Sequence, residues 1–327
     1  MVLVTGSSGF VGKELMNHLL AGKYQVKVFV RQTSADFSTD VEQFLLPDLE
    51  DLNKPSMHEC VQTFLENVDV VVHTAARVHM VNDDSIDPLS EFRKVNRGAT
   101  LTLASLAAES GVKRFVFISS IKVNGESTRP GHSFSPDDDF VPTDPYGLSK
   151  YEAEQGLLKI ARETGLEVVI IRPPLVYGPG VKANFASMMN WMRKGVPLPF
   201  GAIHNKRSLV ALDNLVDFIA LCADREKSPN AANQVFLISD NQDVSTTELL
   251  RKVAKAQNKQ AWLIPVPVGL MTFAAKLIGK GDVANRLFGS LQVDISKARD
   301  LLGWKPVITM DGQLKKTAKE FLDEKTV

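Results

Sequence analysis

Thr5-Gly6-Ser7-Ser8-Gly9-Phe10-Val11-Gly12 follows a short apolar run, residues 2–5, and leads into apolar side chains at helical spacing up to Leu20. Between a strand and a helix, three such glycines allow a tight bend, close approach of a pyrophosphate and close packing of helix on strand. The start of that helix offers unpaired N–H groups to phosphate. The spacing is G-x-x-G-x-x-G rather than G-x-G-x-x-G, and a plain glycine turn is the alternative interpretation. We predict dinucleotide contacts from Gly6, Ser8, Gly9, Phe10, Val11 and Gly12.

Strand and helix patterns alternate through the first half of the chain. Continuous apolar runs predict strands buried on both faces, and apolar residues three and four apart predict helices. This alternation predicts an α/β fold with a Rossmann-type doubly wound parallel sheet over residues 1–172. The predicted strands are 2–5, 25–30, 68–72, 114–118 and 167–171, and the predicted helices are 13–20, 91–109 and 146–163.

After Pro173 the pattern loosens into Pro- and Gly-rich loops between shorter helical segments. The predicted helices of this part are 185–193, 213–224 and 246–256. We predict that residues 173–327 form a smaller substrate-binding region, interwoven with the first domain rather than joined to it by a linker.

The composition excludes several classes of protein. Of 327 residues, 44% are hydrophobic and 23% are charged, as in globular proteins, so general disorder is excluded. Lys and Arg (38) balance Asp and Glu (38), which argues against nucleic acid as the main partner. The two cysteines and the isolated histidines indicate neither a disulfide framework nor a metal site. With no signal peptide and no spanning segment, we expect a cytoplasmic protein without membrane insertion.

The end of the second predicted strand bears on the choice between NAD and NADP. An acidic residue there would accept a hydrogen bond from the 2′-hydroxyl of NAD, but this chain has Val30-Arg31-Gln32. Arg31 is suited to the 2′-phosphate of NADP, and a solvated charge or a guanidinium stacked on the adenine are the other interpretations. Asp48 and Leu49 are placed to meet the adenine edge.

Hydroxyl, phenol and ammonium groups follow one another in an order that suits redox chemistry at an alcohol. Ser119 and Ser120 end a predicted buried strand, and ligands bind at the carboxyl ends of parallel strands. Tyr146 and Lys150 are four apart and lie on one face of a helix. The ammonium would lower the pKa of Tyr146 from about 10, so that the phenol takes a proton from an alcohol while hydride leaves the same carbon. Ser120 would hold the reacting oxygen, and a surface contact between Tyr and Lys is the alternative.

With these motifs the chain resembles the extended short-chain dehydrogenase/reductases, and among them the nucleotide-sugar epimerase/dehydratase family. The resemblance covers nearly the whole chain, and residues 118–125 look like the bacterial polysaccharide subgroup of 4-epimerases and 4-keto reductases. It implies that Ser120, Tyr146 and Lys150 are catalytic, with NAD as cofactor and a UDP-sugar as substrate. The other residues that carry it are His73 to Ala76, Asn96, Arg172-Pro173, Tyr177-Gly178-Pro179, residues 207–213 and residues 294–304.

The resemblance also assigns binding residues. Ala75 and Ala76 would line the nicotinamide side of the cofactor, with Pro173 by the carboxamide, and Asn184 and Arg207 would bind the substrate diphosphate. Beyond the glycine turn, the expected cofactor contacts are Arg31, Asp48, Leu49, Thr74, Ala75, Ala76, Asn96, Ser119, Tyr146, Lys150 and Pro173. The expected substrate contacts are His79, Ser120, Asn124, Tyr146, Asn184, Arg207 and Arg286.

Departures from the family pattern narrow the expected function. Asn124 stands where many members have Tyr in a Val-Tyr-Gly triplet, so the sugar pocket is expected to differ. Ser120-Ile121-Lys122 lacks the Asp-Glu pair that dehydratases of the group often carry, and 4,6-dehydration needs an extra acid and base. Dehydration is therefore not expected.

We expect a UDP-sugar 4-epimerase of the UDP-glucose or UDP-N-acetylhexosamine type, which oxidises C4 transiently on bound cofactor with Tyr146 as base. The alternative is an NADPH-dependent UDP-4-keto-sugar reductase of polysaccharide precursor synthesis, which Arg31 favours. A non-catalytic dinucleotide sensor is a third hypothesis, and the presence of Tyr146 and Lys150 argues against it. The resemblance also implies a homodimer through helices 91–109 and 151–161.

Overall fold

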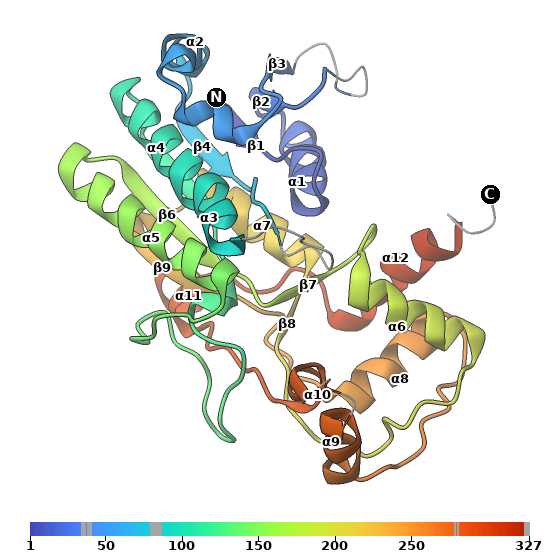
Figure 1. The fold of residues 1–327 in the computed structure, drawn as a ribbon. Helices are drawn as coiled ribbons and strands as arrows, with labels where there is room; N and C mark the ends of the chain where they lie inside the picture. The colour runs from blue at the N-terminus through green and yellow to red at the C-terminus, as the bar shows by residue number, and fades with distance from the viewer. Residues whose placement is uncertain (34–36, 38–40, 79–86, 278, 280, 324–327) are drawn as a thin grey trace.

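The computed structural model describes residues 1–33, 37, 41–78, 87–277, 279 and 281–323. Within them, seven strands form one parallel sheet in the order β3-β2-β1-β4-β5-β6-β9, and β7 pairs with β8 in a second sheet (Figure 1). The Rossmann-type α/β fold expected from the sequence is confirmed. The strands are β1 (Val2–Thr5), β2 (Val26–Val30), β3 (Glu42–Leu45), β4 (Val70–His73), β5 (Arg114–Ile118), β6 (Glu167–Arg172), β7 (Leu175–Tyr177), β8 (Leu209–Ala211) and β9 (Gln234–Leu237).

Helices cover both faces of the large sheet because side chains alternate along each strand. Val2 and Val4 of β1 face a core shared with α1, α7 and α11, whereas Leu3 faces a core shared with α2, α4 and α5. The helices are α1 (Phe10–Ala21), α2 (His58–Leu65), α3 (Pro88–Phe92), α4 (Thr100–Glu109), α5 (Pro145–Thr164), α6 (Ala183–Lys194), α7 (Leu212–Ala223), α8 (Thr246–Ala256), α9 (Val268–Leu277), α10 (Gly281–Phe288), α11 (Ser296–Leu302) and α12 (Met310–Asp323).

The chain after β6 contributes to two layers of the molecule. β9 completes the large sheet beside β6, and α7 packs on α1 against the same sheet. In contrast, α6, α8 and α12 enclose a core of their own around Phe185, Met189 and Leu250. Below this core in Figure 1, α9 and α10 pack against each other. The chain after β6 therefore passes several times between the large sheet and the second region.

The predicted elements of the first half match the observed ones closely, and residues 114–118 match β5 in full. The predicted helix 91–109 is observed as α3, a π-helical segment Arg93–Ala99 and α4 in succession. The strands β3, β7, β8 and β9 and the helices α2 and α9 to α12 were not predicted. β3 is an edge strand of mixed polarity, and only half of its residues are even partly buried, so no apolar run marks it. β9 is four residues long and is defined by its pairing with β6.

Candidate active site

The turn between β1 and α1 requires glycine at two positions. Gly6 has φ +73°, and a Cβ there would lie 2.7 Å from Oγ1 of Thr74. A Cβ on Gly12 would lie 2.0 Å from the carbonyl oxygen of Gly6. That oxygen accepts a hydrogen bond from the N–H of Gly9 at 2.9 Å. The turn thus folds tightly against the end of β4, which side chains at Gly6 or Gly12 would prevent.

The first turn of α1 suits an anion. Gly9 is the N-cap residue, no side chain caps the helix, and its first turn contains no acidic residue. The first N–H groups and the positive end of the helix dipole therefore remain available to a phosphate. Ser8 is exposed beside them, while the side chains of Phe10 and Val11 pack against the core, which leaves their backbone to make any contact. A diphosphate at this position would therefore be bound mainly by the backbone N–H groups of the first turn of α1.

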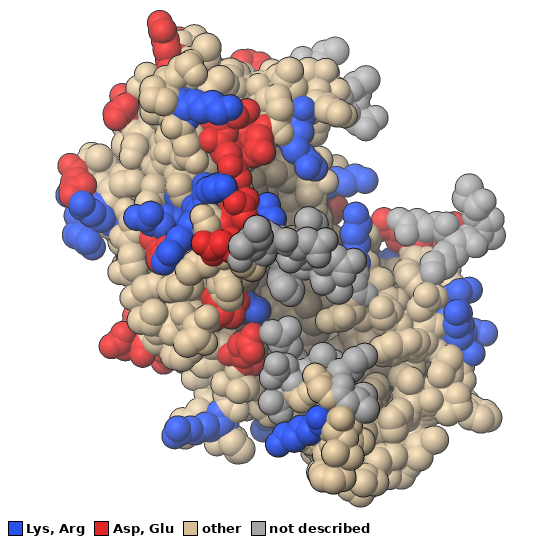
Figure 2. Space-filling view, in the orientation of Figure 1, with Lys and Arg blue, Asp and Glu red and all other residues tan. Residues whose placement is uncertain are grey.

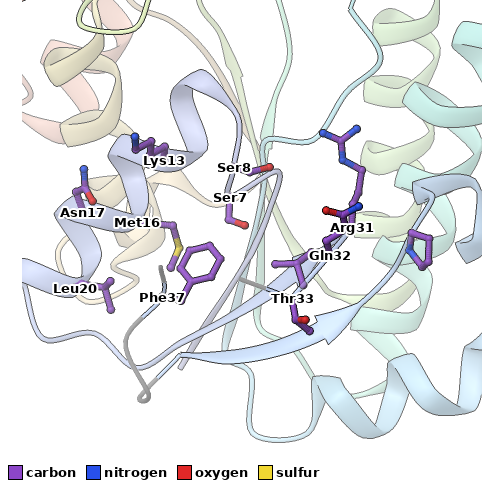
Figure 3. A pocket seen from close by; sticks show the side chains of 12 residues that line it. Ser7, Ser8, Lys13, Met16, Asn17, Leu20, Arg31, Gln32, Thr33 and Phe37 are labelled. Atoms are coloured by element: carbon purple, nitrogen blue, oxygen red, sulfur yellow. The ribbon is translucent and has the colours of Figure 1, made fainter. Parts of the chain in front are cut away.

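A cavity of about 870 Å³ adjoins the glycine turn and the end of β2 (Figure 3). Lys13 enters it from α1 and Arg31 from the end of β2, on either side of Ser7 and Ser8 in this view. Asp48 and Leu49 do not line this cavity, and Asp48 instead caps the short 3-10 helix Leu49–Asn53 by accepting from the N–H of Glu50 at 2.9 Å. The lining residues are Ser7, Ser8, Lys13, Met16, Asn17, Leu20, Val30, Arg31, Gln32, Thr33, Phe37 and Pro47.

The end of β4 is tied to β1 by side-chain hydrogen bonds. His73 is buried, and its ring nitrogens lie 2.7 Å from Oγ1 of Thr5 and 3.0 Å from Oγ1 of Thr100. Burial lowers the pKa of His73 to about 3, so the ring is neutral and structural. The hydroxyl of Thr74 donates to the carbonyl of Thr5 at 2.6 Å, and the N–H of Ala75 lies 3.4 Å from Oγ1 of Thr5. Thr74 and Ala75 are therefore held beside the glycine turn.

Asn96 links this loop to the start of α5. It lies in the π-helical segment, where its Oδ1 accepts from the N–H of Arg77 at 2.9 Å and its amide donates to Oγ of Ser149 at 3.0 Å. The Ser149 hydroxyl in turn donates to the carbonyl of Tyr146 at 2.8 Å. π-Helical segments of this kind often serve functional sites. Here the segment fixes the backbone after β4, where Ala76 lies, against the turn of α5 that carries the phenol.

Ser120, Tyr146 and Lys150 come together at the carboxyl end of β5. The Ser120 hydroxyl lies near the Tyr146 phenol, whose pKa it acts to lower, and the ring of Phe92 packs edge-on against the Tyr146 ring at 5.8 Å. Nζ of Lys150 donates to the carbonyl of Ile118 at 2.9 Å. The predicted grouping of these three residues at one strand end is thus present in the structure.

The pKa values of this group differ from the sequence-based expectation. Tyr146 is partly exposed to solvent, yet the protein around it desolvates the phenol and raises its pKa to about 12. Burial lowers the pKa of Lys150 to about 7, against the attraction of Glu154. The expected lowering of the Tyr146 pKa by the ammonium is therefore not observed. Desolvation of the phenol is the largest cause of this upward shift, and the charge of Asp144 adds to it.

A buried ion pair lies behind Lys150. Glu154, one turn further along α5, binds the guanidinium of Arg172 with two oxygens, the shortest N–O distance being 2.6 Å. The Ser119 hydroxyl donates to the same carboxylate at 2.5 Å. Arg172 also donates to Oδ1 of Asn124 at 3.0 Å. The sequence offered no local signal for this pair, because Glu154 and Arg172 lie 18 residues apart on different elements.

This network changes the expectation for Asn124 and Ser119. The Asn124 side chain is buried, with its oxygen bound to Arg172 and its amide donating to the carbonyl of Ser135 at 2.7 Å. Its amide is used within the protein, so a direct substrate contact from this side chain is not supported. Ser119 is likewise buried and bound to Glu154, which leaves Ser120 as the partly exposed hydroxyl of the two.

The N-terminus of α5 is fixed by Asp144, which sequence reasoning missed. Its side chain accepts from the N–H of Gly147 at 3.0 Å, and Nζ of Lys122 donates to it at 3.2 Å. An Asp directly before a Pro at the first helical position is a known sequence signal for a helix start. On the opposite side of Ser120, the N–H of Ile121 donates to the carbonyl of Pro173 at 3.0 Å. The start of α5, which carries Tyr146, and the segment that follows Ser120 are therefore both held in place by hydrogen bonds.

The residues expected to bind the substrate in the second region are less closely grouped. Asn184 is exposed at the start of α6. Arg207 is half-buried, its backbone pairs with Val244, and its guanidinium donates to the carbonyl of Gly289 at 3.1 Å. Arg286 lies in α10, and His79 lies outside the described residues.

Neither a metal cluster nor a spanning helix is found in the part of the chain that the structure describes. No group of three or more His, Cys, Asp or Glu side chains there could hold a metal ion. Among the described helices, none has the length and apolar character needed to cross a membrane.

The chain is similar in sequence to known proteins. A sequence model of the NAD dependent epimerase/dehydratase family matches residues 2–238. The chain is 50% identical over 323 residues to a UDP-glucose 4-epimerase of Vibrio cholerae, and the alignment covers 98% of this chain and 95% of that protein.

Solved structures extend the similarity to three dimensions. The UDP-glucose 4-epimerase of Thermotoga maritima, determined with UDP-glucose, matches with a TM-score of 0.74 at 25% identity and covers 99% of both chains. The NAD complex of a Thermus thermophilus UDP-glucose 4-epimerase matches in fold with a TM-score of 0.76 at 22% identity and 98% coverage of both chains. The second region is therefore part of the shared fold, along with the large sheet.

Proposed function

Because the chain belongs to the NAD-dependent epimerase/dehydratase family, we propose that it is a UDP-sugar 4-epimerase, acting on UDP-glucose or a UDP-N-acetylhexosamine. The observation that carries the proposal is that Ser120, Tyr146 and Lys150 lie together at the carboxyl end of β5. The glycine turn lies on the same side of the sheet, at the carboxyl end of β1. The 50% identity to a UDP-glucose 4-epimerase along nearly the whole chain supports the same activity.

Each of the three residues has a role in this proposal. Tyr146 accepts the proton of the sugar 4-hydroxyl and later returns it, and its phenol lies near the Ser120 hydroxyl. Ser120 holds the reacting oxygen by a second hydrogen bond. Lys150 contributes positive charge one helical turn from the phenol, which offsets the cost of forming phenolate in a desolvated place. Bound NAD supplies the hydride acceptor and donor at C4.

The observed geometry supports binding of a dinucleotide across the carboxyl ends of the parallel strands. The diphosphate would bind to the N–H groups of the first turn of α1, and the adenosine would occupy the cavity lined by Ser8 and Arg31. Ala75, Ala76 and Pro173 would line the nicotinamide, while Asn96 supports their backbone from behind. The site fits NAD, and the cations at the cavity make NADP the alternative dinucleotide.

The substrate side of the proposal rests on the family likeness. Asn184 and Arg207 would bind the UDP diphosphate, with Arg286 and His79 as further candidates. We assign Asn124 a supporting role, since it holds Arg172 from the side of the sugar pocket. We further propose that the enzyme is a cytoplasmic homodimer associating through α4 and α5.

The direct test is the turnover of UDP-sugars by the purified full chain without added cofactor. We expect UDP-glucose or UDP-N-acetylglucosamine to be converted to its C4 epimer, and the protein to carry retained dinucleotide visible in its absorbance. Light scattering would report the dimer. If no UDP-sugar is epimerised although dinucleotide is bound, the proposed activity is wrong.

A reductase is the second candidate because Arg31, at the end of β2, lines the cavity beside the glycine turn. A guanidinium there suits the 2′-phosphate of NADPH, which a 4-keto-sugar reductase would consume. Oxidation of added NADPH only in the presence of a UDP-4-keto sugar would identify this activity. A sensor without catalytic function would instead bind dinucleotide and keep its biological activity as the Tyr146→Phe variant.

A further inference from the structure

Large apolar side chains gather on the surface of the second region, at the lower end of the molecule in Figure 1. They come from the segment that precedes α9 and from α9 itself. Their exposed fractions run from 53% at Ile264 to 72% at Leu277. We call this the α9 surface, and its members are Trp262, Ile264, Leu270, Phe273 and Leu277.

The arrangement on α9 is that of one helix face. Leu270, Phe273 and Leu277 follow at intervals of three and four residues, and no residue of α9 is buried. The segment before it is fixed to the second region, because the N–H of Ile264 donates to the carbonyl of Leu198 at 2.8 Å. An exposed apolar patch of this kind marks an interaction site more often than a free surface.

Acidic residues are sparse along the chain on either side of this surface. The chain contains no Asp or Glu from residue 168 to 212 or from residue 249 to 281, although the whole protein has no net charge. These two segments include α6, the part of α8 after Glu248, and α9, and their Lys and Arg residues include the exposed Lys194, Lys259 and Lys276. Figure 2 shows the acidic side chains gathered over the other half of this face, while the lower right is tan and blue.

We propose that the α9 surface docks on an anionic lipid bilayer, lying in the interface without spanning it. Apolar side chains of a short helix would enter the region between headgroups and acyl chains, and Trp262 is a residue type favoured at that depth. Lysines at its border would remain at the anionic headgroups. The one-sided charge favours this partner over a second copy of the chain, since two such surfaces would bring cations together.

The proposal is tested by sedimentation of the full-length protein with lipid vesicles. We expect binding to phosphatidylcholine vesicles that contain roughly a third phosphatidylglycerol, and at least about tenfold weaker binding to phosphatidylcholine alone. Salt should weaken the binding, because the lysines act through screened charge. Equal binding to both lipids would contradict the charge argument, and no binding to either would overturn the proposal.

Variants separate this surface from general stickiness. Leu270→Ser with Phe273→Ser should reduce vesicle binding by about tenfold or more, and Lys276→Glu by about fivefold or more. The control is Val307→Ser, since Val307 is 61% exposed, as is Phe273, but lies outside the α9 surface. UDP-sugar turnover without vesicles and the thermal midpoint should stay unchanged in all of them. If the double variant binds vesicles like the wild type, or if it abolishes only self-association measured by light scattering, the proposed lipid contact is wrong.

Discussion

At the scale of single residues, burial shifts the protonation of the proposed catalytic group. It raises the pKa of Tyr146 to about 12 and lowers that of Lys150 to about 7, so burial stabilises the neutral form of each side chain relative to its charged form. A phenolate at Tyr146 therefore needs positive charge close by. Asp144, near the same helix end, acts in the opposite direction and raises the pKa of Tyr146 further. We therefore expect Lys150 to stabilise the Tyr146 phenolate only when it is protonated and close to the phenol.

Replacing Tyr146 by Phe removes the proposed proton acceptor and leaves the ring packing on Phe92 largely intact. Proton transfer by a positioned group contributes about 10²–10⁴-fold, so we expect kcat for UDP-glucose to fall by at least about a hundredfold. The Kd for dinucleotide, measured by fluorescence quenching, should change little. Ser120→Ala provides a milder comparison, because it removes a hydrogen bond but not the base. Retention of wild-type kcat in Tyr146→Phe would contradict the assignment.

Lys150 makes the stability of the cofactor-free protein depend on pH. Its folded pKa is about 7, far below the value near 10.5 expected in the unfolded chain. Between these values the unfolded state binds more protons, so stability rises with pH from about 7 to 10 and is flat below. Lys150→Met lacks this dependence. We expect the thermal midpoint of the wild type to rise with pH relative to that of the variant, and parallel curves from pH 7 to 9.5 would show the prediction to be wrong.

At the scale of elements, the glycine turn joins strand, helix and phosphate site in eight residues. Gly12 is the contact point between α1 and the turn, since a Cβ there would overlap the Gly6 carbonyl. Asp144 has a comparable function for α5, where it satisfies the N–H of Gly147 and pairs with Lys122. Short polar or absent side chains at helix starts therefore position both the glycine turn, where we propose that the cofactor binds, and Tyr146, the proposed base.

Gly12→Ala should force α1 away from the turn. We expect a loss of about 2 kcal/mol or more in unfolding free energy and at least about tenfold weaker dinucleotide binding, measured by denaturant titration and by fluorescence. Gly269→Ala is the matched control, because a Cβ at Gly269 meets nothing within 4 Å and that position lies in the helix α9. Its stability should stay equal or rise slightly. Equal behaviour of the two variants would contradict the packing argument.

At the scale of the whole molecule, the buried pair of Glu154 and Arg172 joins separate parts of the chain. Glu154 belongs to α5 and Arg172 ends β6, while Ser119 and Asn124 attach the segment after β5 to the same charges. The pair lies one helical turn beyond Lys150. It holds α5, the end of β6 and the segment after β5 together. Breaking it should therefore affect both stability and the placement of the catalytic group.

Removing one partner leaves an uncompensated buried charge. We expect Glu154→Leu or Arg172→Met alone to cost about 3 kcal/mol of unfolding free energy, and the double variant to cost clearly less than their sum. Urea titration of the four proteins gives the coupling energy. As a surface comparison, removing the exposed pair of Lys159 and Glu163 should cost less than about 1 kcal/mol. Additive losses at the buried pair would show that the two charges do not stabilise each other.

The parallel sheet and the glycine turn follow from sequence patterns alone, and so does the placement of Tyr146 and Lys150 one turn apart on α5. These features are local, since apolar runs, glycine spacing and a four-residue interval act through neighbouring residues and survive in any fold of this class. Only the structure shows which short strands join the sheet, as with β9, and which partners the buried polar side chains bind. It directed Asn124 toward Arg172 and Lys150 toward the Ile118 carbonyl, and it raised the Tyr146 pKa. Burial, pairing and desolvation depend on residues far apart in the chain, and for that reason only the tertiary structure could decide them.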